Sequence, residues 1–161
     1  IWKKCINPNL HFVYILRKAQ KYQKNPLLNT FWRIVLRHYQ IKYGFQIYPE
    51  TQIGEGFYLG HWGSLVINPK TIIGKNCLLA AQVGIAGGTI LEDGVTLWGQ
   101  VGVNKTIRIG AGAVVLGQAG VTNNLEGGKT YMGFPATEAS AKRRELVWIK
   151  RIPELWKKVM D

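Results

Sequence analysis

Acidic residues are missing from the first 43 positions of this 161-residue chain, whereas nine lysines and arginines fall there. The whole sequence has 21 Lys and Arg against 9 Asp and Glu, which gives a formal net charge of +12. Because a basic field steers and retains anionic ligands, we expect phosphorylated molecules, acidic proteins or a membrane surface as partners. The alternative is that the basic residues only form solvated faces that keep the protein in solution. Nucleic acid is not expected, since the charge lies in the terminal segments and the central segment carries no nucleic-acid-binding motif.

Long apolar runs, cysteines and clustered metal ligands are also scarce. No stretch reaches the roughly 18 apolar residues of a membrane span, and the charged start lacks the apolar part of a secretory signal, so we expect a cytoplasmic protein. The two cysteines, Cys5 and Cys77, are too few for a disulfide framework and are expected to be free thiols. The three histidines, His11, His38 and His61, are too dispersed to ligate a metal, so no metal site is predicted.

Aliphatic residues, by contrast, recur six positions apart through the centre of the chain. A helix would repeat its apolar face every 3.6 residues and a half-buried strand every two, so neither has this period. Turn residues such as Gly74, Asp93 and Gly110 punctuate the series. Each hexad is therefore predicted to form a short strand and a corner, with three hexads to a triangular coil. The rungs of this ladder are Ile73, Leu79, Ile85, Leu91, Leu97, Val103, Ile109, Val115 and Val121.

A second column and an upstream extension complete the repeat. Small or branched residues stand two positions before most rungs, at Thr51, Thr71, Val83, Thr89, Val95, Val101, Ala113 and Ala119. The ladder continues upstream through Ile47, Ile53, Leu59 and Ile67 if two extra residues are allowed after His61. About four coils at the 4.7–4.9 Å spacing of hydrogen-bonded strands make a prism roughly 20 Å tall.

The repeat divides the chain into a basic helical arm (1–43), a β-helix (44–136) and C-terminal helices (137–161). In this last segment we predict one helix over 139–152 and a short one over 154–160, with Pro153 in the first turn of the second.

In the arm, the apolar pattern favours helices over 10–24 and 29–42, separated by Asn25-Pro26. We expect these helices to cover the first coil, as the terminal units of repeat proteins do. Peripheral contact with a membrane is the alternative, because Trp, Tyr, Lys and Arg are interfacial residues.

The hexad pattern resembles the left-handed parallel β-helix of the hexapeptide-repeat acyltransferases. The usual rule for parallel crossovers favours a right-handed turn, so the left hand is implied by the resemblance alone. The resemblance also implies a homotrimer with active sites in the clefts between subunits.

The segment from Tyr43 to Asn76 resembles the serine acetyltransferases, including their capsule-type relatives. Histidine is the side chain best tuned to take a proton near neutral pH, and the resemblance implies that His61 is the general base. The carboxylate that partners this histidine in the family falls on Gln46 here, while His11 and His38 lie on the arm, where packing roles are expected. The matching motifs are Ile47-Tyr48-Pro49, Ile53-Gly54-Glu55-Gly56 and Gly60-His61-Trp62-Gly63.

From Cys77 onward the chain resembles another group, the UDP-3-O-(3-hydroxyacyl)glucosamine N-acyltransferases of lipid A synthesis. Its basic tail then implies binding of acyl carrier protein, although that family's catalytic histidine falls on Pro69. The two resemblances meet near Asn76-Cys77 in hexad register, which a natural paralogue and an engineered chimera both explain. The motifs are Ala80-Ala81-Gln82-Val83-Gly84-Ile85-Ala86-Gly87, Gly99-Gln100-Val101-Gly102-Val103, Gly117-Gln118-Ala119-Gly120-Val121-Thr122, Gly133-Phe134-Pro135-Ala136 and Arg151-Ile152-Pro153-Glu154-Leu155.

Both resemblances imply a thioester donor, acyl-CoA or acyl carrier protein, lying along a cleft between prisms. Glycines would let the donor approach the backbone closely, although corners need glycine for their turns as well. Thr137 stands where many relatives have a basic residue near the coenzyme tail. The candidate donor-binding residues are Gly87, Gly88, Gly102, Gly117, Gly120, Gly133, Pro135 and Ala136.

Three functions stay open, in this order. The first is an acetyl-CoA-dependent O-acetyltransferase for a small alcohol or sugar, with His61 as the base. The second is an N-acyltransferase that depends on acyl carrier protein. The third is a non-catalytic trimeric scaffold.

Overall fold

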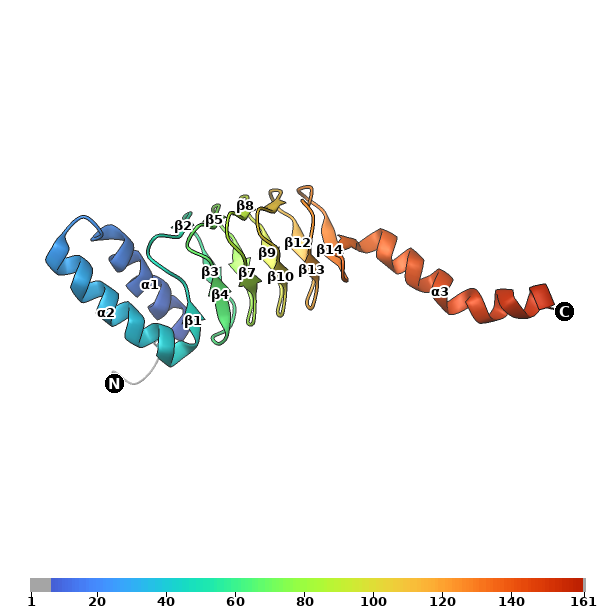
Figure 1. The fold of residues 1–161 in the computed structure, drawn as a ribbon, viewed down its shortest axis with the longest axis horizontal. Helices are drawn as coiled ribbons and strands as arrows, with labels where there is room; N and C mark the ends of the chain where they lie inside the picture. The colour runs from blue at the N-terminus through green and yellow to red at the C-terminus, as the bar shows by residue number, and fades with distance from the viewer. Residues whose placement is uncertain (1–6, 161) are drawn as a thin grey trace.

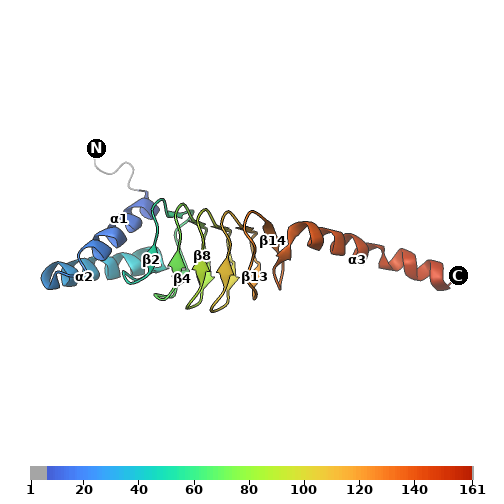
Figure 2. The same cartoon turned by 90° about the horizontal axis from the view of Figure 1, so that it is seen from above.

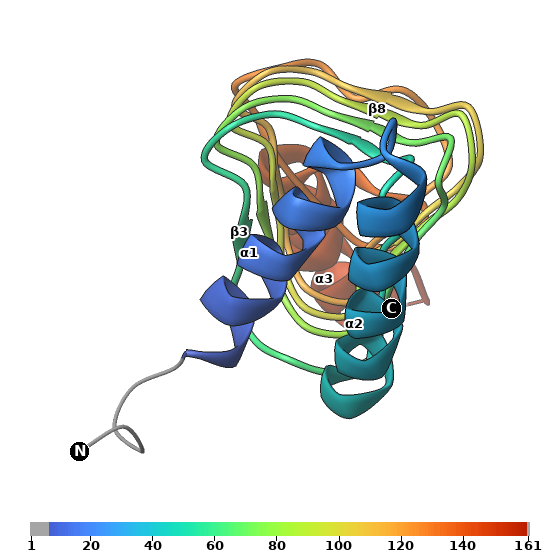
Figure 3. The ribbon, with the colours of Figure 1, turned by 90° about the vertical axis from the view of Figure 1, so that its left-hand side faces the viewer.

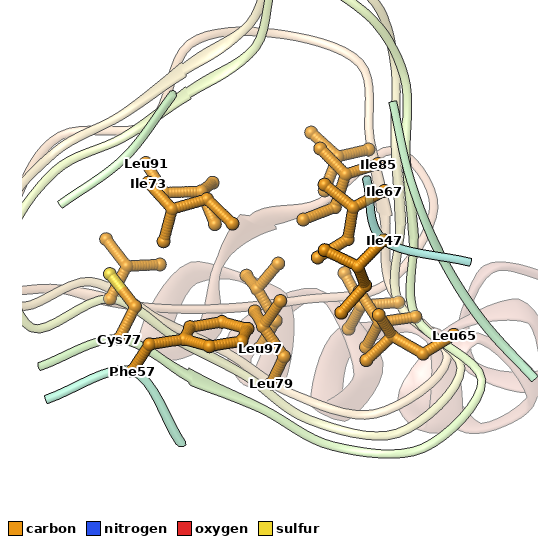
Figure 4. Close-up of a cluster of buried hydrophobic side chains, with 14 of the residues drawn as sticks. Ile47, Phe57, Leu65, Ile67, Ile73, Cys77, Leu79, Ile85, Leu91 and Leu97 are labelled. Atoms are coloured by element: carbon orange, nitrogen blue, oxygen red, sulfur yellow. The ribbon is translucent and has the colours of Figure 1, made fainter. Parts of the chain in front are cut away.

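The computed structural model describes residues 7–160 and shows a parallel β-solenoid between two helical ends (Figure 1). Every ladder residue from Ile73 to Val121 is at most 4% exposed, and the eight residues of the second column are at most 1% exposed. Both columns are buried along the axis of the prism, and Figure 4 shows the ladder residues Ile73, Leu79, Ile85, Leu91 and Leu97 pointing inward. The fold class expected from the six-residue period is therefore confirmed.

The strands form three faces, each a stack of short parallel strands. Face A contains β1 (Phe45–Gln46), β4 (Leu65–Ile67), β7 (Gly84–Ile85), β10 (Gly102–Val103) and β13 (Gly120–Val121). Face B contains β2 (Gln52–Ile53), β5 (Ile72–Ile73), β8 (Ile90–Leu91) and β11 (Arg108–Ile109). Face C contains β3 (Tyr58–Leu59), β6 (Leu78–Leu79), β9 (Thr96–Leu97), β12 (Val114–Val115), β14 (Thr130–Met132) and β15 (Thr137–Glu138).

The coils turn left-handed. Viewed from the N-terminal end, the chain passes from the face of β8 to the face of β3 counter-clockwise while it recedes from the viewer (Figure 3). This is the hand that the acyltransferase resemblance implied, against the usual rule for parallel crossovers.

The register departs from eighteen residues per coil at two places. The first coil pairs with the second at a separation of 20, as in Tyr58↔Leu78, and the two extra residues lie in the corner between β3 and β4 that holds His61. This interruption was predicted. A second departure was missed: Val114 pairs with Thr130, so the last coil is two residues short.

The arm forms a helical hairpin, α1 (Pro8–Lys21) and α2 (Pro26–Tyr43). Both helices begin earlier than predicted, because each has an Asn-Pro start in which the asparagine side chain caps the first turn. Buried residues of α1, including Phe12 and Leu16, join the axial core, so the hairpin covers the open end of the first coil (Figure 3). Arg17 of α1 donates to the carbonyl oxygens of Ile53 and Gly54 and fastens the hairpin to the prism.

At the other end, one long helix, α3 (Ala139–Met160), projects from the prism (Figures 1 and 2). The prediction of two helices separated at Pro153 was wrong, because Pro153 lies inside α3. A proline removes one backbone hydrogen bond and crowds the preceding turn, which favours a bend. From Arg143 to Met160 every described side chain of α3 is exposed, so no packing opposes such a bend. Within residues 7–160, no helix is both long and apolar enough to cross a membrane.

A carboxylate ties successive coils together on the B side of the prism. Glu92 accepts hydrogen bonds from the backbone N–H of Ala111 (2.8 Å) and from Nε of Arg108 (2.6 Å). The hydrogen bond from Ala111 is the main cause, and that from the Arg108 side chain the second, that lowers the pKa of Glu92 below its usual value.

We therefore expect Glu92→Gln to lower the melting temperature at neutral pH. Because the folded-state pKa is lowered, this contribution is present above the unfolded-state pKa and is lost as pH falls through the folded-state value. Thermal melts of the parent and the Glu92→Gln variant from pH 7 into the acid range test this. A difference in melting temperature that stays constant on acidification would contradict it.

Candidate active site on face A

His61 lies at the stretched corner between β3 and β4, where the chain leaves face C and enters face A. Its side chain is exposed, as is that of Trp62 beside it, and Gly63 and Ser64 have positive φ values of 105° and 44°. No hydrogen bond joins the His61 side chain to another residue in 7–160. The corner therefore presents a histidine that is free to contact a ligand.

The same corner in the next three coils is closed by a ladder of glutamines. Gln82, Gln100 and Gln118 all have φ between 60° and 64°. The Nε2 atom of Gln100 donates to Oε1 of Gln82 (2.8 Å), and Nε2 of Gln118 donates to Oε1 of Gln100 (2.9 Å). The three regular corners are thus joined by side-chain hydrogen bonds, and the longer His61 corner is not part of this ladder.

A groove runs along the outer surface of face A. Its floor is formed by the outward-facing positions of β4, β7, β10 and β13, which are Val66, Gly84, Gly102 and Gly120. Three of these four have no side chain, so the surface is hollowed over a volume of about 420 Å³. The remaining lining residues include Ala86, Asn104, Thr122 and Phe134.

Gly102 is a glycine that the fold itself does not require. A Cβ atom added at Gly102 would meet no atom within 4 Å, and the φ of Gly102 lies outside the left-handed range. Both statements also hold for Gly84. Gly88 and Gly133, by contrast, have φ values of +74° and +90°, which favour glycine for conformational reasons alone. At Gly120 the ring of Phe134 fills the space that a side chain would take. Packing and backbone conformation therefore do not explain why β7 and β10 have glycine on the groove floor.

The structure brings together only some of the predicted donor-binding residues. Gly102 and Gly120 lie on the groove floor. The closing turn is joined to that floor, because the Gly120 N–H donates to the Gly133 carbonyl (3.0 Å) and the Ala136 N–H donates to the Gly120 carbonyl (2.9 Å). Pro135 lies in the same turn.

The other three candidates lie at the edges of face A. Gly87 lines a neighbouring hollow with Pro69, and Gly88 follows it in the corner toward face B. Gly117 belongs to the corner of the glutamine ladder. The predicted set missed Gly84 and Phe134, although glycines eighteen residues apart at 84, 102 and 120 would have indicated the open column.

At its N-terminal end the groove continues into a hollow between face A and α2. This hollow is lined by Arg37 and Ile41 of α2 together with Gln46, Tyr48 and Val66. Gln46 donates through Nε2 to the Tyr48 hydroxyl (3.0 Å), and among residues 7–160 no hydrogen bond joins it to His61. From Val66 to Gly120 the floor spans three strand spacings, or about 14 Å.

The cysteine that the structure describes is not placed to react with a ligand. Cys77 is fully buried, its thiol donates to the Glu92 carbonyl (3.1 Å), and burial raises its pKa, so it is not an accessible nucleophile. Cys5 lies outside the described residues. Within 7–160, no three His, Cys, Asp or Glu side chains gather closely enough to hold a metal ion.

The chain matches no protein-family model, but it has curated relatives. UDP-3-O-acylglucosamine N-acyltransferase from a Caulobacter species is 36% identical over 102 residues, which are 63% of this chain and 29% of that protein. The Campylobacter lari protein of the same name is 48% identical over 63 residues, 39% of this chain and 20% of its own length. The chain thus spans less than a third of the relatives it matches. The 102-residue match is longer than segment 77–161, so this likeness is not confined to the part after Cys77.

Solved serine acetyltransferases share the fold. The Neisseria gonorrhoeae enzyme in complex with serine has a TM-score of 0.72 at 20% identity, covering 81% of this chain and 56% of that one. A serine acetyltransferase in complex with CoA has a TM-score of 0.69 at 18% identity, covering 80% and 56%. Both resemblances stated from the sequence are therefore confirmed: the curated relatives are N-acyltransferases of the glucosamine type, and the structural neighbours are serine acetyltransferases.

Proposed function

We propose that this chain is an acyltransferase that moves an acyl group from a thioester donor, most simply acetyl-CoA, to the hydroxyl of a small alcohol or sugar. The observation that carries the proposal is the glycine-floored groove, which runs about 14 Å along face A from the level of the His61 coil to the closing turn. An extended pantetheine arm fits such a groove because its open floor lets a ligand approach the backbone. The solved serine acetyltransferase in complex with CoA supports this donor.

The proposed reaction is direct transfer. His61 takes the proton from the acceptor hydroxyl while the acceptor oxygen bonds to the thioester carbonyl carbon. The carbon–sulfur bond then breaks, and the thiolate leaves and is protonated to the thiol. A general base contributes about 10²–10⁴-fold, and one backbone N–H directed at the oxyanion contributes roughly 10²–10³-fold.

We also propose a homotrimer, in which the His61 corner of one subunit faces the groove of the next. Tyr58, Trp62 and Trp98 on the prism wall are between 42% and 62% exposed, and such aromatic side chains are enriched at protein interfaces. A second prism would cover them. Light scattering of the purified chain tests this assembly, and a monomeric mass would contradict it.

The test of the activity is thiol release from acetyl-CoA and from a longer acyl-CoA, measured with a panel of amino-acid, sugar and amino-sugar acceptors. Release that depends on one acceptor class supports the proposal and names the substrate. If thiol release stays at background with every acceptor, both from these acyl-CoA donors and from acylated carrier protein, the non-catalytic scaffold is the function that remains.

A second candidate is favoured by the curated relatives and by α3. Those relatives are N-acyltransferases, and α3 is an exposed helix with basic residues at Lys142, Arg143, Arg144, Lys150, Arg151, Lys157 and Lys158. Such a surface suits an acidic carrier protein as donor. Lys142 is paired with Glu145 (2.8 Å), which leaves Arg143 and Arg144 as the better residues to test.

Under this second candidate, Arg143→Glu with Arg144→Glu is expected to lower transfer from acyl carrier protein at least about tenfold and to leave transfer from acyl-CoA unchanged, because charge across an interface controls association. Lys75→Glu with Lys105→Glu, two exposed charge reversals on the prism, is the matched control. Equal loss with both donors would argue against a carrier-specific surface.

A further inference from the structure

The outer face of α2 carries a stripe of exposed aliphatic and aromatic side chains. Leu27, Phe31, Ile34 and Ile41 are 84%, 55%, 67% and 69% exposed. Their spacing of four, three and seven residues places them on one side of the helix over about 21 Å. We call these four residues the α2 stripe.

The α2 stripe is opposite the face that α2 uses for packing. Leu36 and Gln40 are buried on that inner face, where Nε2 of Gln40 donates to the Ile47 carbonyl (2.8 Å). Trp32, Val35 and Tyr39 pack against the core from the same side. The hairpin therefore completes the cap without using the stripe, whose exposure the fold does not explain.

The charge around the stripe has a single sign. Positions 7–43 contain seven Lys and Arg and no Asp or Glu, whereas residues 44–136 carry five of each. Arg33 is paired with Glu50 on the prism, but Arg37 and Lys42 flank the stripe without an acidic partner among residues 7–160. An apolar stripe set among lysines and arginines is the composition of a helix that lies in the plane of a membrane interface.

A second copy of this chain is a poorer occupant of the same face. Pairing two stripes would bring Arg37 and Lys42 of both copies together, with no acidic side chain of either arm to compensate. Anionic headgroups supply that compensation, and the acyl region accepts the aliphatic side chains.

We propose that the α2 stripe binds the surface of an anionic lipid bilayer, with α2 lying in the interface plane. The end of the stripe at Ile41 also lines the hollow that joins α2 to the groove of face A. Membrane binding would therefore place this hollow next to the lipid surface. The proposal does not depend on the acyltransferase activity.

Vesicle co-sedimentation of the purified chain tests the proposal. We expect binding to phosphatidylcholine vesicles that contain phosphatidylglycerol, weak binding to phosphatidylcholine alone, and release by salt, because headgroup attraction is screened. Phe31→Ser with Ile34→Ser should weaken binding at least about tenfold, since both side chains leave the apolar face. Circular dichroism and a thermal melt check that this variant is folded, as both positions are exposed.

The matched control is on α3, the other exposed basic helix. Ile149→Ser with Val159→Ser removes two side chains that are 56% and 77% exposed, and binding should persist. Loss of binding in this control alone, equal binding by the stripe variant, or equal binding to both kinds of vesicle would overturn the proposal. A stripe variant that changes the mass of the assembly in light scattering while its vesicle binding is unchanged would assign the stripe to a second copy, which also overturns it.

Discussion

Replacing His61 with alanine is expected to lower acceptor-dependent thiol release by about 10²–10⁴-fold, because the acceptor then loses its proton to water rather than to a positioned base. The folded state should hardly change. His61 is exposed and its side chain makes no hydrogen bond within residues 7–160, so the substitution removes no packing and no hydrogen-bond partner. The measurement is kcat and KM for the best acceptor in both proteins, together with a thermal melt.

Gln52→Ala is the matched control for His61→Ala. Gln52 is an exposed polar residue on face B, remote in the topology from face A and the stretched corner. A base acts mainly on kcat, so the variant should lose kcat while the donor KM is retained. If His61→Ala keeps the parent rate, the catalytic role inferred for this residue is wrong, whatever the acceptor.

Gly102→Leu is expected to raise the KM for the acyl donor at least about tenfold without lowering stability. A leucine at this outward position would stand in the open floor of the groove, where a Cβ meets nothing within 4 Å. The backbone tolerates the change, since φ is outside the left-handed range. Removing a strand glycine also relieves about 0.5–1 kcal/mol of conformational entropy cost.

The corresponding control is Gln52→Leu, which adds a leucine to an exposed strand position on face B. Donor saturation curves and thermal melts of both variants separate a blocked groove from a disturbed fold. An unchanged donor KM in Gly102→Leu would place the donor on another surface of the prism. An equal rise in Gln52→Leu would indicate a non-specific effect of added apolar surface.

The second column illustrates how the fold follows from the sequence. Thr71 and Thr89 are fully buried, although threonine is polar, because the Thr89 hydroxyl donates to the Asn104 carbonyl (2.9 Å) in the next coil. Thr51, at the same position in the first coil, is also buried, although its hydroxyl has no hydrogen-bond partner among the described residues. Periodicity therefore identified these positions as a column of small or branched residues, and the structure shows that they are buried.

The α3 helix illustrates the opposite case. Pro153 is a local signal for a helix boundary, yet the helix passes through it, because an exposed helix can bend where a packed one would have to break or shift its neighbours. The shortened last coil was missed for a related reason: the chain near Asn123 and Asn124 drops two residues from the corner, and only strand pairing shows which hexad lost them.

The candidate site was predicted in part. His61 stood out because the register was stretched there, and the structure places both extra residues in its corner. The donor positions were harder, since every corner glycine is chemically alike in sequence. Only the tertiary structure distinguishes these glycines. Gly133 has a φ value that favours glycine, and Gly120 packs under the ring of Phe134. Neither backbone conformation nor packing requires a glycine at Gly102.

The sequence by itself determined the solenoid, its axial core and the uneven charge, because each follows from a period or a count that holds whatever the packing. Tertiary structure decided which outward positions line up, since residues 84, 102 and 120 become one groove floor only when coils stack at eighteen residues. It also decided which face of α2 stays free, because the cap buries Leu36 and leaves Phe31 and Ile34 exposed. Stacking and docking join residues that are far apart in the chain, and such long-range contacts are absent from any local pattern.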